Sequence, residues 1–323
     1  MPKPLVSVIM PVYNAQNYVE EAILSILNQT YQNFEFIIIN DGSTDKSLEI
    51  IQKYAKKDNR IKVISRENKG LIYSLNEGIK LSKGKYIARM DADDISLSYR
   101  FEKQIEFMEN NLDVGICGSS AIVFDDKTEK KWIVYKDENR IKAELLFSSP
   151  FIHPSVMIRK SIIDKYNFFY DKDYIHAEDL ELWVRMSDFI KLANIQDILF
   201  KYRDTPNSVT NKADKDTEKR YKVIKNIFSF YLKKLDIKNN EKENLLHFYL
   251  TVNHRIKDNK IDRNELYNYF EKIVNANKVK KIFDDFSLKK VLGKRWLWYV
   301  YYKKDFSAIF SKYFIYGLLG LKK

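Results

Sequence analysis

The sequence predicts an α/β fold in which a mostly parallel central sheet is flanked by helices and followed by a helical, basic C-terminal region. Strand-length apolar runs alternate with amphipathic helical patterns over the first 95 residues, which predicts parallel strands joined by right-handed crossovers. One run, Ile37-Ile38-Ile39, is apolar at consecutive positions, as expected for a strand covered on both faces. Beyond about residue 210 the strand patterns end and lysine-rich helical patterns follow.

The first 95 residues are expected to contain four strands and three helices. The strands are expected at residues 6–10, 34–39, 61–64 and 86–90, and the helices at residues 18–27, 47–54 and 72–81. No GxGxxG sequence and no phosphate-loop glycine pattern occurs in this region. Neither a dinucleotide-binding fingerprint nor a P-loop is therefore supported.

The next part of the chain is predicted to complete the sheet and to cover one end of it. Helices are expected at residues 100–109, 140–147 and 179–187, strands at 114–124, 155–159, 190–193 and 198–202, and a hairpin at 125–134. The turn cluster Thr205-Pro206-Asn207-Ser208 then marks a boundary. We therefore expect a first domain at residues 1–210, with halves at 1–95 and 96–210, and a separate helical region at 211–323.

The positive charge of the chain is concentrated in the C-terminal region. The 323 residues carry a formal net charge of +12. Residues 211–323 contain 27 Lys and Arg against 13 Asp and Glu, whereas the first 210 residues contain 29 basic and 31 acidic side chains. This asymmetry is typical of a module that faces an anionic surface, either a membrane or a nucleic acid. The alternative is a lysine-rich helical face exposed to water.

Composition and the N-terminal sequence favour a cytoplasmic protein. Cys117 is the only cysteine, which excludes an intramolecular disulfide. The chain enters a strand-length apolar run at about residue 5, and no small-residue cleavage site follows, so we expect no signal peptide. No apolar stretch reaches the roughly 18 residues that span a bilayer. With 45% hydrophobic residues, the chain is expected to bury an ample core.

The triplet Asp91-Ala92-Asp93 directly follows the expected strand at 86–90. Ligands of open α/β sheets bind beyond the carboxyl ends of the strands. Mg²⁺ and Mn²⁺ prefer carboxylate oxygens and are commonly held by one or two carboxylates together with substrate phosphates. The triplet therefore indicates a Mg²⁺ or Mn²⁺ site that neutralises the diphosphate of a nucleotide-linked substrate. The alternative is an ordinary solvated acidic loop.

Polar and aromatic residues follow two neighbouring strands of the same predicted sheet. Pro11 is expected to end the first strand because it has no N–H to donate, after which Tyr13 offers an aromatic face and Asn14 an amide. Asp41 follows the second strand and is expected beside Tyr13. An aromatic face next to an acceptor carboxylate suits a nucleobase with an exposed N–H, of which uracil is the simplest. Each piece alone is also consistent with turn or capping residues, and we expect such a role for Asn68-Lys69-Gly70.

Residues 5–204 resemble the family 2 glycosyltransferases, which are inverting sugar transferases with the GT-A fold. The resemblance rests on five segments that occur in the family's order: residues 6–14, Ile26-Leu27-Asn28-Gln29-Thr30-Tyr31, residues 40–45, residues 84–94, and His176-Ala177-Glu178-Asp179-Leu180-Glu181-Leu182-Trp183. The chain is similar in particular to bacterial galactosyl- and N-acetylhexosaminyltransferases that build surface glycans. The resemblance implies a nucleotide-binding half at residues 1–95 and an acceptor half at 96–210.

The resemblance implies a role for each matching position. Uracil would be contacted by Tyr13 and Asp41, and Asp91 would contact the ribose or the donor sugar. Asp93 would hold the metal that bridges the diphosphate. The remaining donor-binding positions would be Pro11, Asn14 and Ala92.

Asp179 would be the general base, because an inverting transfer needs one base to remove the proton of the attacking acceptor hydroxyl. The alternative for Glu178-Asp179 is an acidic helix start favoured by the helix dipole. Glu178 and His176 are further candidates for contact with the acceptor. Trp183 is expected either to form a wall for the acceptor or to pack its helix.

One departure from the family pattern concerns the metal. Relatives often carry a histidine soon after the arginine that corresponds to Arg203, whereas this chain has Asp204 and Thr205 there. We therefore expect the metal to be held by Asp93, the diphosphate and water, and a ligand role for Asp91 stays open as an alternative to its contact with the donor. Arg295-Trp296 superficially matches the Gln-x-x-Arg-Trp sequence of processive relatives, but Leu292 occupies the Gln position. A single-addition enzyme is the better interpretation.

We therefore predict a metal-dependent inverting glycosyltransferase with Mg²⁺ or Mn²⁺ as cofactor. It would move a hexose or N-acetylhexosamine, with galactose types favoured, from a UDP-sugar to a hydroxyl of a glycan or lipid-linked glycan acceptor in lipooligosaccharide, capsule or exopolysaccharide. One alternative is a sugar-phosphate nucleotidyltransferase, but residues 11–14 do not form the glycine-rich, basic triphosphate loop that it requires. The other alternative is a nucleic-acid-binding protein, motivated only by the basic C-terminal region.

Residues 287–323 combine lysines with many aromatic side chains. Segments rich in Lys, Trp and Phe lie in membrane interfaces and are attracted to anionic lipid. We therefore expect peripheral binding to the inner face of the cytoplasmic membrane through this segment. The alternatives are that these aromatic residues pack against the rest of the protein or form the contact of a homodimer.

Overall fold

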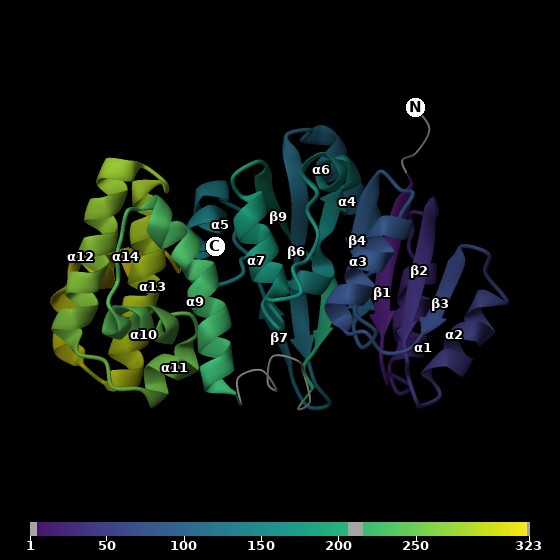
Figure 1. Cartoon of the computed structure of the whole chain (residues 1–323), viewed down its shortest axis with the longest axis horizontal. Coiled ribbons are helices and arrows are strands. Elements are labelled where there is room, and N and C mark those ends of the chain that lie inside the picture. Colours follow the sequence, from purple (N-terminus) through teal and green to yellow (C-terminus); the bar gives the residue numbers. More distant parts are fainter. Residues whose placement is uncertain (1–4, 206–215, 322–323) are drawn as a thin grey trace. The chain divides into compact units, whose positions relative to one another are not determined.

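The computed structural model describes residues 5–205 and 216–321, which form two compact units (Figure 1). Within the described residues, the first unit comprises 5–134 and 151–205, and the second comprises 135–150 and 216–321. Residues 135–150 were predicted in the first domain but belong to the second unit, because helix α5 (Glu138–Glu144) packs on helix α13 (Asp285–Lys303). Of the expected turn cluster, Pro206, Asn207 and Ser208 lie outside the described residues.

The first unit is built on a single twisted sheet with the strand order β3-β2-β1-β4-β8-β6-β9-β5 (Figure 1). Its bounds are β1 Val6–Val12, β2 Phe34–Asp41, β3 Ile61–Arg66, β4 Tyr86–Arg89, β5 Ile95–Ser96, β6 Val114–Phe124, β8 Met157–Arg159 and β9 Lys191–Arg203. Strands β3, β2, β1 and β4 are parallel, as predicted. Strand β8 is antiparallel to β4 and β6, β9 is parallel to β6, and the short β5 is antiparallel to β9. Strand β7 (Glu129–Trp132) pairs with β6 in the expected hairpin.

Helices cover both faces of the parallel part of the sheet. The helices of the first unit are α1 Val19–Leu27, α2 Ser47–Ala55, α3 Leu71–Leu81, α4 Arg100–Asn110, α6 Lys160–Tyr166 and α7 Glu178–Met186, with the short helix η1 at His153–Ser155. Val8 and Met10 join the core formed with α1 and α4. Ile9 points to the other face, where Gly78 of α3 approaches so closely that a Cβ would lie 2.4 Å from the Ile9 side chain. This two-sided burial confirms the interpretation of the apolar strand runs.

Two sequence-based expectations about this unit are wrong, and two of its elements were not predicted. Pro11 does not end β1, because it pairs with Ile39 inside the parallel ladder. The backbone of Ile9 faces β4, since its carbonyl accepts from the Met90 N–H at 3.0 Å, and residues two apart face the same way. The nitrogen of Pro11, which has no hydrogen to donate, therefore faces the side on which β4 has already ended. The separate strands expected at 190–193 and 198–202 are one irregular strand, β9, and neither β5 nor α6 was predicted.

The second unit is helical, as predicted. Its helices are α5, α9 Thr217–Lys234, α10 Glu241–Tyr249, α11 Asn253–Asp258, α12 Arg263–Lys280, α13, η2 Phe306–Phe310 and α14 Lys312–Leu319. Helix α13 contributes fully buried residues to its core, among them Arg295 and Trp296. The guanidinium of Arg295 contacts the buried carboxylate of Glu144 at 2.8 Å. None of the described helices combines the length and hydrophobicity needed to cross a membrane.

Candidate functional site

Three carboxylates gather at the carboxyl end of β4. One ligand oxygen from each of Asp91, Asp93 and Asp94 can be chosen so that all lie within 4.8 Å of one another. The sequence analysis identified the first two, and it missed Asp94. Asp94 is brought to the cluster by the strand that follows it, because β5 joins β9 at the far edge of the sheet. Its position directly after Asp93 was the feature of the sequence that could have identified Asp94 as a member of the cluster.

The electrostatics of this cluster are those of crowded, partly desolvated carboxylates. Burial and the neighbouring Asp91 raise the pKa of Asp93 to about 6. The pKa of Asp94 lies well above its usual range, because Asp94 is buried beside the other two acids. One oxygen of Asp94 accepts the Arg203 N–H at 2.7 Å, while Oδ2 is buried and has no hydrogen-bond partner among the described residues. A divalent cation would relieve this repulsion and occupy the unpartnered oxygen, so the donor set fits Mg²⁺ or Mn²⁺.

Two arginines hold the acidic cluster in place, and a tyrosine lies within its electrostatic range. Arg89 forms an ion pair with Asp91. Arg203, at the end of β9, donates from Nε to the Asp93 carbonyl at 2.7 Å. Burial and the three aspartates raise the pKa of the Tyr202 hydroxyl on the same strand. No role was predicted for Tyr202 and Arg203, because strand β9 is far from the cluster in sequence.

The loops after β1 and β2 are tied together by Asn14. Its backbone lies in the left-handed region, with φ of 50°. Its side-chain oxygen accepts the Thr44 N–H at 2.8 Å, and its own N–H donates to the Ser43 hydroxyl at 3.0 Å. Tyr13, directly before it, remains 55% exposed. The structure therefore gives Asn14 the role of fixing a loop that presents Tyr13 at the sheet edge.

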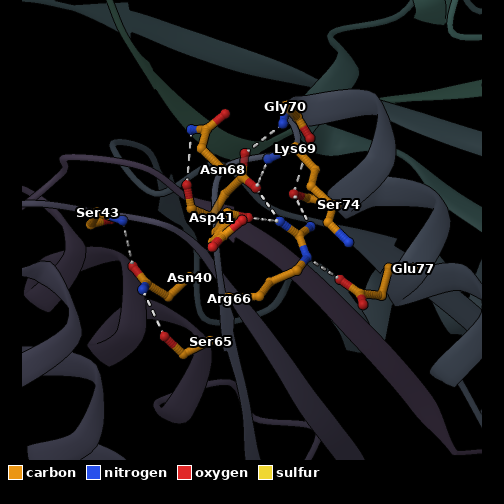
Figure 2. Close-up of polar contacts among 11 residues, drawn as sticks. Asn40, Asp41, Ser43, Ser65, Arg66, Asn68, Lys69, Gly70, Ser74 and Glu77 are labelled. Carbon is orange, nitrogen blue, oxygen red and sulfur yellow. Dashed lines mark hydrogen bonds and ion pairs between the residues drawn. The ribbon is translucent and has the colours of Figure 1, made fainter.

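The carboxylate of Asp41 anchors the loop that follows β3 (Figure 2). Asp41 is the last residue of β2 and is buried. Its Oδ1 accepts the Lys69 N–H at 2.8 Å and its Oδ2 accepts the Gly70 N–H at 2.9 Å. The Asn68 side chain completes this arrangement by donating to the Asp41 carbonyl at 2.9 Å. Asn68-Lys69-Gly70 is thus a turn, as expected, and it is shaped around Asp41.

Arg66 is a central residue of this network that the sequence analysis missed. It lies at the end of β3 and forms ion pairs with Asp41 and with Glu77, the latter at 2.9 Å (Figure 2). Its guanidinium also donates to the Ser74 hydroxyl at 2.9 Å and lies 4.7 Å from the centre of the Tyr73 ring. Arg66 therefore compensates the charge of the buried Asp41 and joins β2, β3 and α3.

The acidic pair Glu178-Asp179 opens helix α7, as the sequence analysis expected. Burial raises the pKa of the nearby Tyr170 hydroxyl, and Arg89 opposes this rise. The carboxylates of Asp179, Glu178 and Asp91 raise the pKa further. The Tyr170 hydroxyl therefore lies within electrostatic range of both the start of α7 and the cluster after β4.

Trp183 lies in the core rather than at the surface. It is fully buried, and its ring packs edge-on against Phe151, His153 and Tyr170. Of the two expected roles for Trp183, the structure supports packing of the helix and not a wall that an acceptor would touch. His153 beneath it contacts the Tyr170 hydroxyl through Nε2 at 2.9 Å. Burial and the neighbouring Arg89 hold the pKa of His153 well below its usual value, so the ring is neutral.

A cavity of about 980 Å³ lies between α3 and residues 170–178. Its lining includes Gly70, Tyr73, Lys80, His176 and Glu178. It therefore extends from the loop anchored by Asp41 to the first turn of α7.

Asn76 holds the two walls of this cavity at a fixed separation. Its amide nitrogen donates to the Tyr170 carbonyl at 2.8 Å, and its oxygen accepts the Tyr170 N–H at 2.9 Å. His176 is exposed on the wall opposite α3 and has φ of 67°. The walls of the cavity are thus held by hydrogen bonds within the first unit. Two of the three candidate acceptor residues, His176 and Glu178, line it.

Comparisons with known proteins agree with this geometry. A family model described as glycosyl transferase family 2 matches residues 7–167. An uncharacterized glycosyltransferase of Haemophilus influenzae is 37% identical over 283 residues, which cover 83% of this chain and 86% of that protein. The O-antigen biosynthesis glycosyltransferase WbnJ of Escherichia coli is 36% identical over 204 residues, covering 62% of this chain and 79% of WbnJ.

A solved structure shows the same fold. The crystal structure of residues 1–349 of S. aureus TarS in complex with UDP-GlcNAc has a TM-score of 0.62 to this chain. The match covers 94% of this chain and 88% of that one, at 18% sequence identity. The mixed sheet flanked by helices is thus the predicted GT-A fold.

Proposed function

Because this chain belongs to glycosyl transferase family 2, we propose that it transfers a hexose or an N-acetylhexosamine from a UDP-sugar to a hydroxyl of a bacterial surface glycan. The observation that carries the proposal is the cluster of Asp91, Asp93 and Asp94 after β4, beside the strand ends that present Tyr13 and Asp41. UDP-GlcNAc is the ligand of the TarS structure, and WbnJ is described as an O-antigen enzyme. Both support this donor and acceptor class, and the family resemblance of the sequence is the reason that we favour a galactose-type sugar.

Asp93 and Asp94 would hold a divalent cation, Mg²⁺ or Mn²⁺, together with the donor diphosphate. Such a cation supplies positive charge against the negative charge that develops on the leaving diphosphate. Asp91 has a different role in this proposal, because Arg89 already neutralises it. Its oxygens would accept hydroxyls of the ribose or of the donor sugar, next to the backbone of Ala92.

The donor base would lie on the exposed ring of Tyr13. One oxygen of Asp41, Oδ2, accepts the Gly70 N–H and keeps the capacity to accept a second hydrogen bond. The imide N–H of uracil would supply that bond, whereas the corresponding nitrogen of cytosine carries no hydrogen. Pro11 and Asn14 would shape the backbone around the base.

Asp179 would act as the general base at the start of α7. Its carboxylate would take the proton of the acceptor hydroxyl while that oxygen attacks the anomeric carbon from the face opposite the nucleotide. The transfer then occurs in one displacement and inverts the anomeric configuration. A second nucleophilic carboxylate is not required.

The acceptor would enter the cavity between α3 and residues 170–178. Glu178 and His176 line it, and both can hydrogen-bond sugar hydroxyls. Trp183 would not contact the acceptor, and its role would be to fix the position of α7 by packing. A volume of about 980 Å³ is at the upper end of the range for small-ligand sites, as an oligosaccharide end would require.

A donor panel tests this proposal. Purified full-length protein is incubated with Mn²⁺ and, separately, UDP-glucose, UDP-galactose, UDP-GlcNAc, UDP-GalNAc and GDP-mannose, and the nucleotide diphosphate released is measured. We expect slow release of UDP from at least one UDP-sugar, and loss of that release after chelation of the metal. Release of GDP alone, or release unaffected by chelation, would contradict the proposed donor or the proposed metal.

A further inference from the structure

The last segment of the second unit is apolar on two opposite sides. It consists of η2 and α14, joined at Ser311, and continues to Leu321. A helix at a protein surface is normally apolar on one stripe and polar on the other. Apolar side chains all round indicate a helix covered on both sides, and the described residues of the second unit cover one of these two sides.

The inner side of this segment packs on the helices of the second unit. Tyr313 and Ala308 are buried, and the Ala308 carbonyl accepts the indole N–H of Trp296 at 2.9 Å. Gly317 faces Gly293 of α13 so closely that a Cβ on Gly317 would lie 2.5 Å from the Gly293 carbonyl oxygen. The inner side is therefore complete without any partner.

The outer side exposes large apolar side chains at helical spacing. Three of them follow the i, i+3, i+4 pattern in η2 and three more do so in α14. We call this set, with Leu321, the C-terminal apolar face: Phe306, Ile309, Phe310, Ile315, Leu318, Leu319 and Leu321. Phe310 is 90% exposed and Phe306 is 71% exposed. So many exposed large apolar side chains within 16 residues indicate an interaction surface.

The charges around this face are mainly positive. Lys304 and Lys312 are exposed beside it, and Lys312 also pairs with Glu271 of α12 at 2.8 Å. Asp305 is the only acidic residue from Asp305 to Leu321, and it is engaged by the Tyr299 hydroxyl at 3.1 Å and by Arg263. Exposed apolar side chains bordered by lysines are typical of interfacial membrane segments.

We propose that the C-terminal apolar face rests on an anionic lipid surface. The phenylalanine and aliphatic side chains would enter the boundary between headgroups and acyl chains, while the lysines face lipid phosphates. A second copy of the chain is less well suited as the occupant, because two such faces would bring lysines of like charge together. This location also corrects the broader expectation for residues 287–323, since Trp296 and Tyr299 of α13 are buried in the protein.

Vesicle flotation of the full-length protein tests the proposal. Vesicles of phosphatidylcholine alone are compared with vesicles containing phosphatidylglycerol, at low and at high salt. We expect binding to the anionic vesicles that weakens at high salt. The double variant Phe306→Ser/Phe310→Ser should reduce this binding at least about tenfold, because two large apolar side chains no longer enter the interface.

The control is Val279→Ser, which removes an apolar side chain that is 76% exposed on α12 of the same unit. It should bind vesicles like the wild type, and both variants should keep the wild-type melting temperature. Equal flotation of wild type and double variant would overturn the proposal. The proposal would also be overturned if the wild type does not bind vesicles but forms a dimer in solution that the double variant does not form. Because the readout is binding and not catalysis, its failure would leave the proposed transferase activity untouched.

Discussion

Asp94 is the carboxylate of the candidate metal site that the sequence did not predict. It is buried, it keeps Oδ2 without a partner among the described residues, and it shares the cluster with Asp93. We expect Asp94→Asn to weaken Mn²⁺ binding in the presence of UDP at least about tenfold, because a neutral amide replaces a charged ligand. Titration calorimetry measures this directly.

The matched control for that substitution is Asp113→Asn. Asp113 is an exposed carboxylate of the same unit that pairs with Lys191, and its loss should leave Mn²⁺ affinity unchanged. Asp93→Ala should abolish metal-dependent UDP binding altogether. Unchanged Mn²⁺ affinity in both cluster variants would contradict the assignment of the site.

Arg66 carries a second prediction at the scale of one residue. Arg66→Met leaves the buried carboxylate of Asp41 without its guanidinium partner, so we expect a loss of about 3 kcal/mol in the free energy of unfolding. We also expect weaker UDP binding, since the Lys69-Gly70 turn is anchored on the same carboxylate. Denaturant unfolding and UDP titration give the two readouts.

Lys53→Met provides the comparison, because Lys53 pairs with Glu20 in an exposed ion pair. Its removal should leave the free energy of unfolding nearly unchanged, because water and salt screen an exposed pair. Equal effects of the two substitutions would show that the Arg66 network contributes nothing beyond a surface ion pair.

Among the helices and strands, the sequence predicted those whose positions follow from local hydrophobic patterns. Apolar runs and amphipathic helices identified β1 to β4 and α1 to α4 to within a few residues. Pairing between distant segments could not be read from the sequence in the same way. Strand β5 has two residues and exists because β9 lies beside it, and this pairing brings Arg203 to the carbonyl of Asp93 and the side chain of Asp94.

The same distinction separates the site residues that the sequence predicted from those that it did not. Asp91, Asp93, Asp41 and Glu178-Asp179 follow or begin elements that the sequence marks, and motif order identified them. Arg66 and Tyr170 act through contacts made in three dimensions, so no local pattern distinguished them. The burial of Trp183 likewise depends on Phe151 and His153, which local patterning does not connect with α7.

The crossing of α13 and α14 gives a prediction at this scale. The backbones of Gly293 and Gly317 approach so closely that an added Cβ meets main-chain atoms. Gly317→Val should force α14 away from α13 and lower the free energy of unfolding by about 1–3 kcal/mol or more. Ile315→Val is the control, because Ile315 lies on the same helix and its side chain is 59% exposed. Denaturant unfolding that does not distinguish the two would contradict this packing.

At the scale of the whole molecule, His247 makes the stability of the second unit depend on pH. Its Nδ1 contacts the Tyr269 hydroxyl at 2.7 Å and its Nε2 contacts the Leu146 carbonyl at 2.8 Å. Burial lowers the pKa of His247 from its usual value to about 3 in the folded protein. Between pH 6.5 and pH 3 the His247 ring is therefore protonated in the unfolded chain and neutral in the folded chain. This contribution to stability is complete above pH 6.5 and is lost as the pH falls, by about 1.4 kcal/mol per pH unit.

His247→Gln tests that pH dependence. Glutamine keeps hydrogen-bonding capacity at this position but does not titrate, so the variant should lose less stability than the wild type between pH 7 and pH 4. Urea unfolding at a series of pH values provides the measurement. Identical slopes in the two proteins would exclude His247 as the origin.

We propose that the start of α7 forms one transfer site with Asp41 and the three aspartates after β4, with Asp179 as its base. The direct measurement is a paired determination, for Asp179→Asn and wild type, of UDP-sugar turnover with an accepting glycan and of UDP affinity in the presence of Mn²⁺. We predict that turnover falls at least about 10²-fold while UDP affinity stays within a few-fold of the wild-type value. Unchanged turnover in Asp179→Asn would contradict the account.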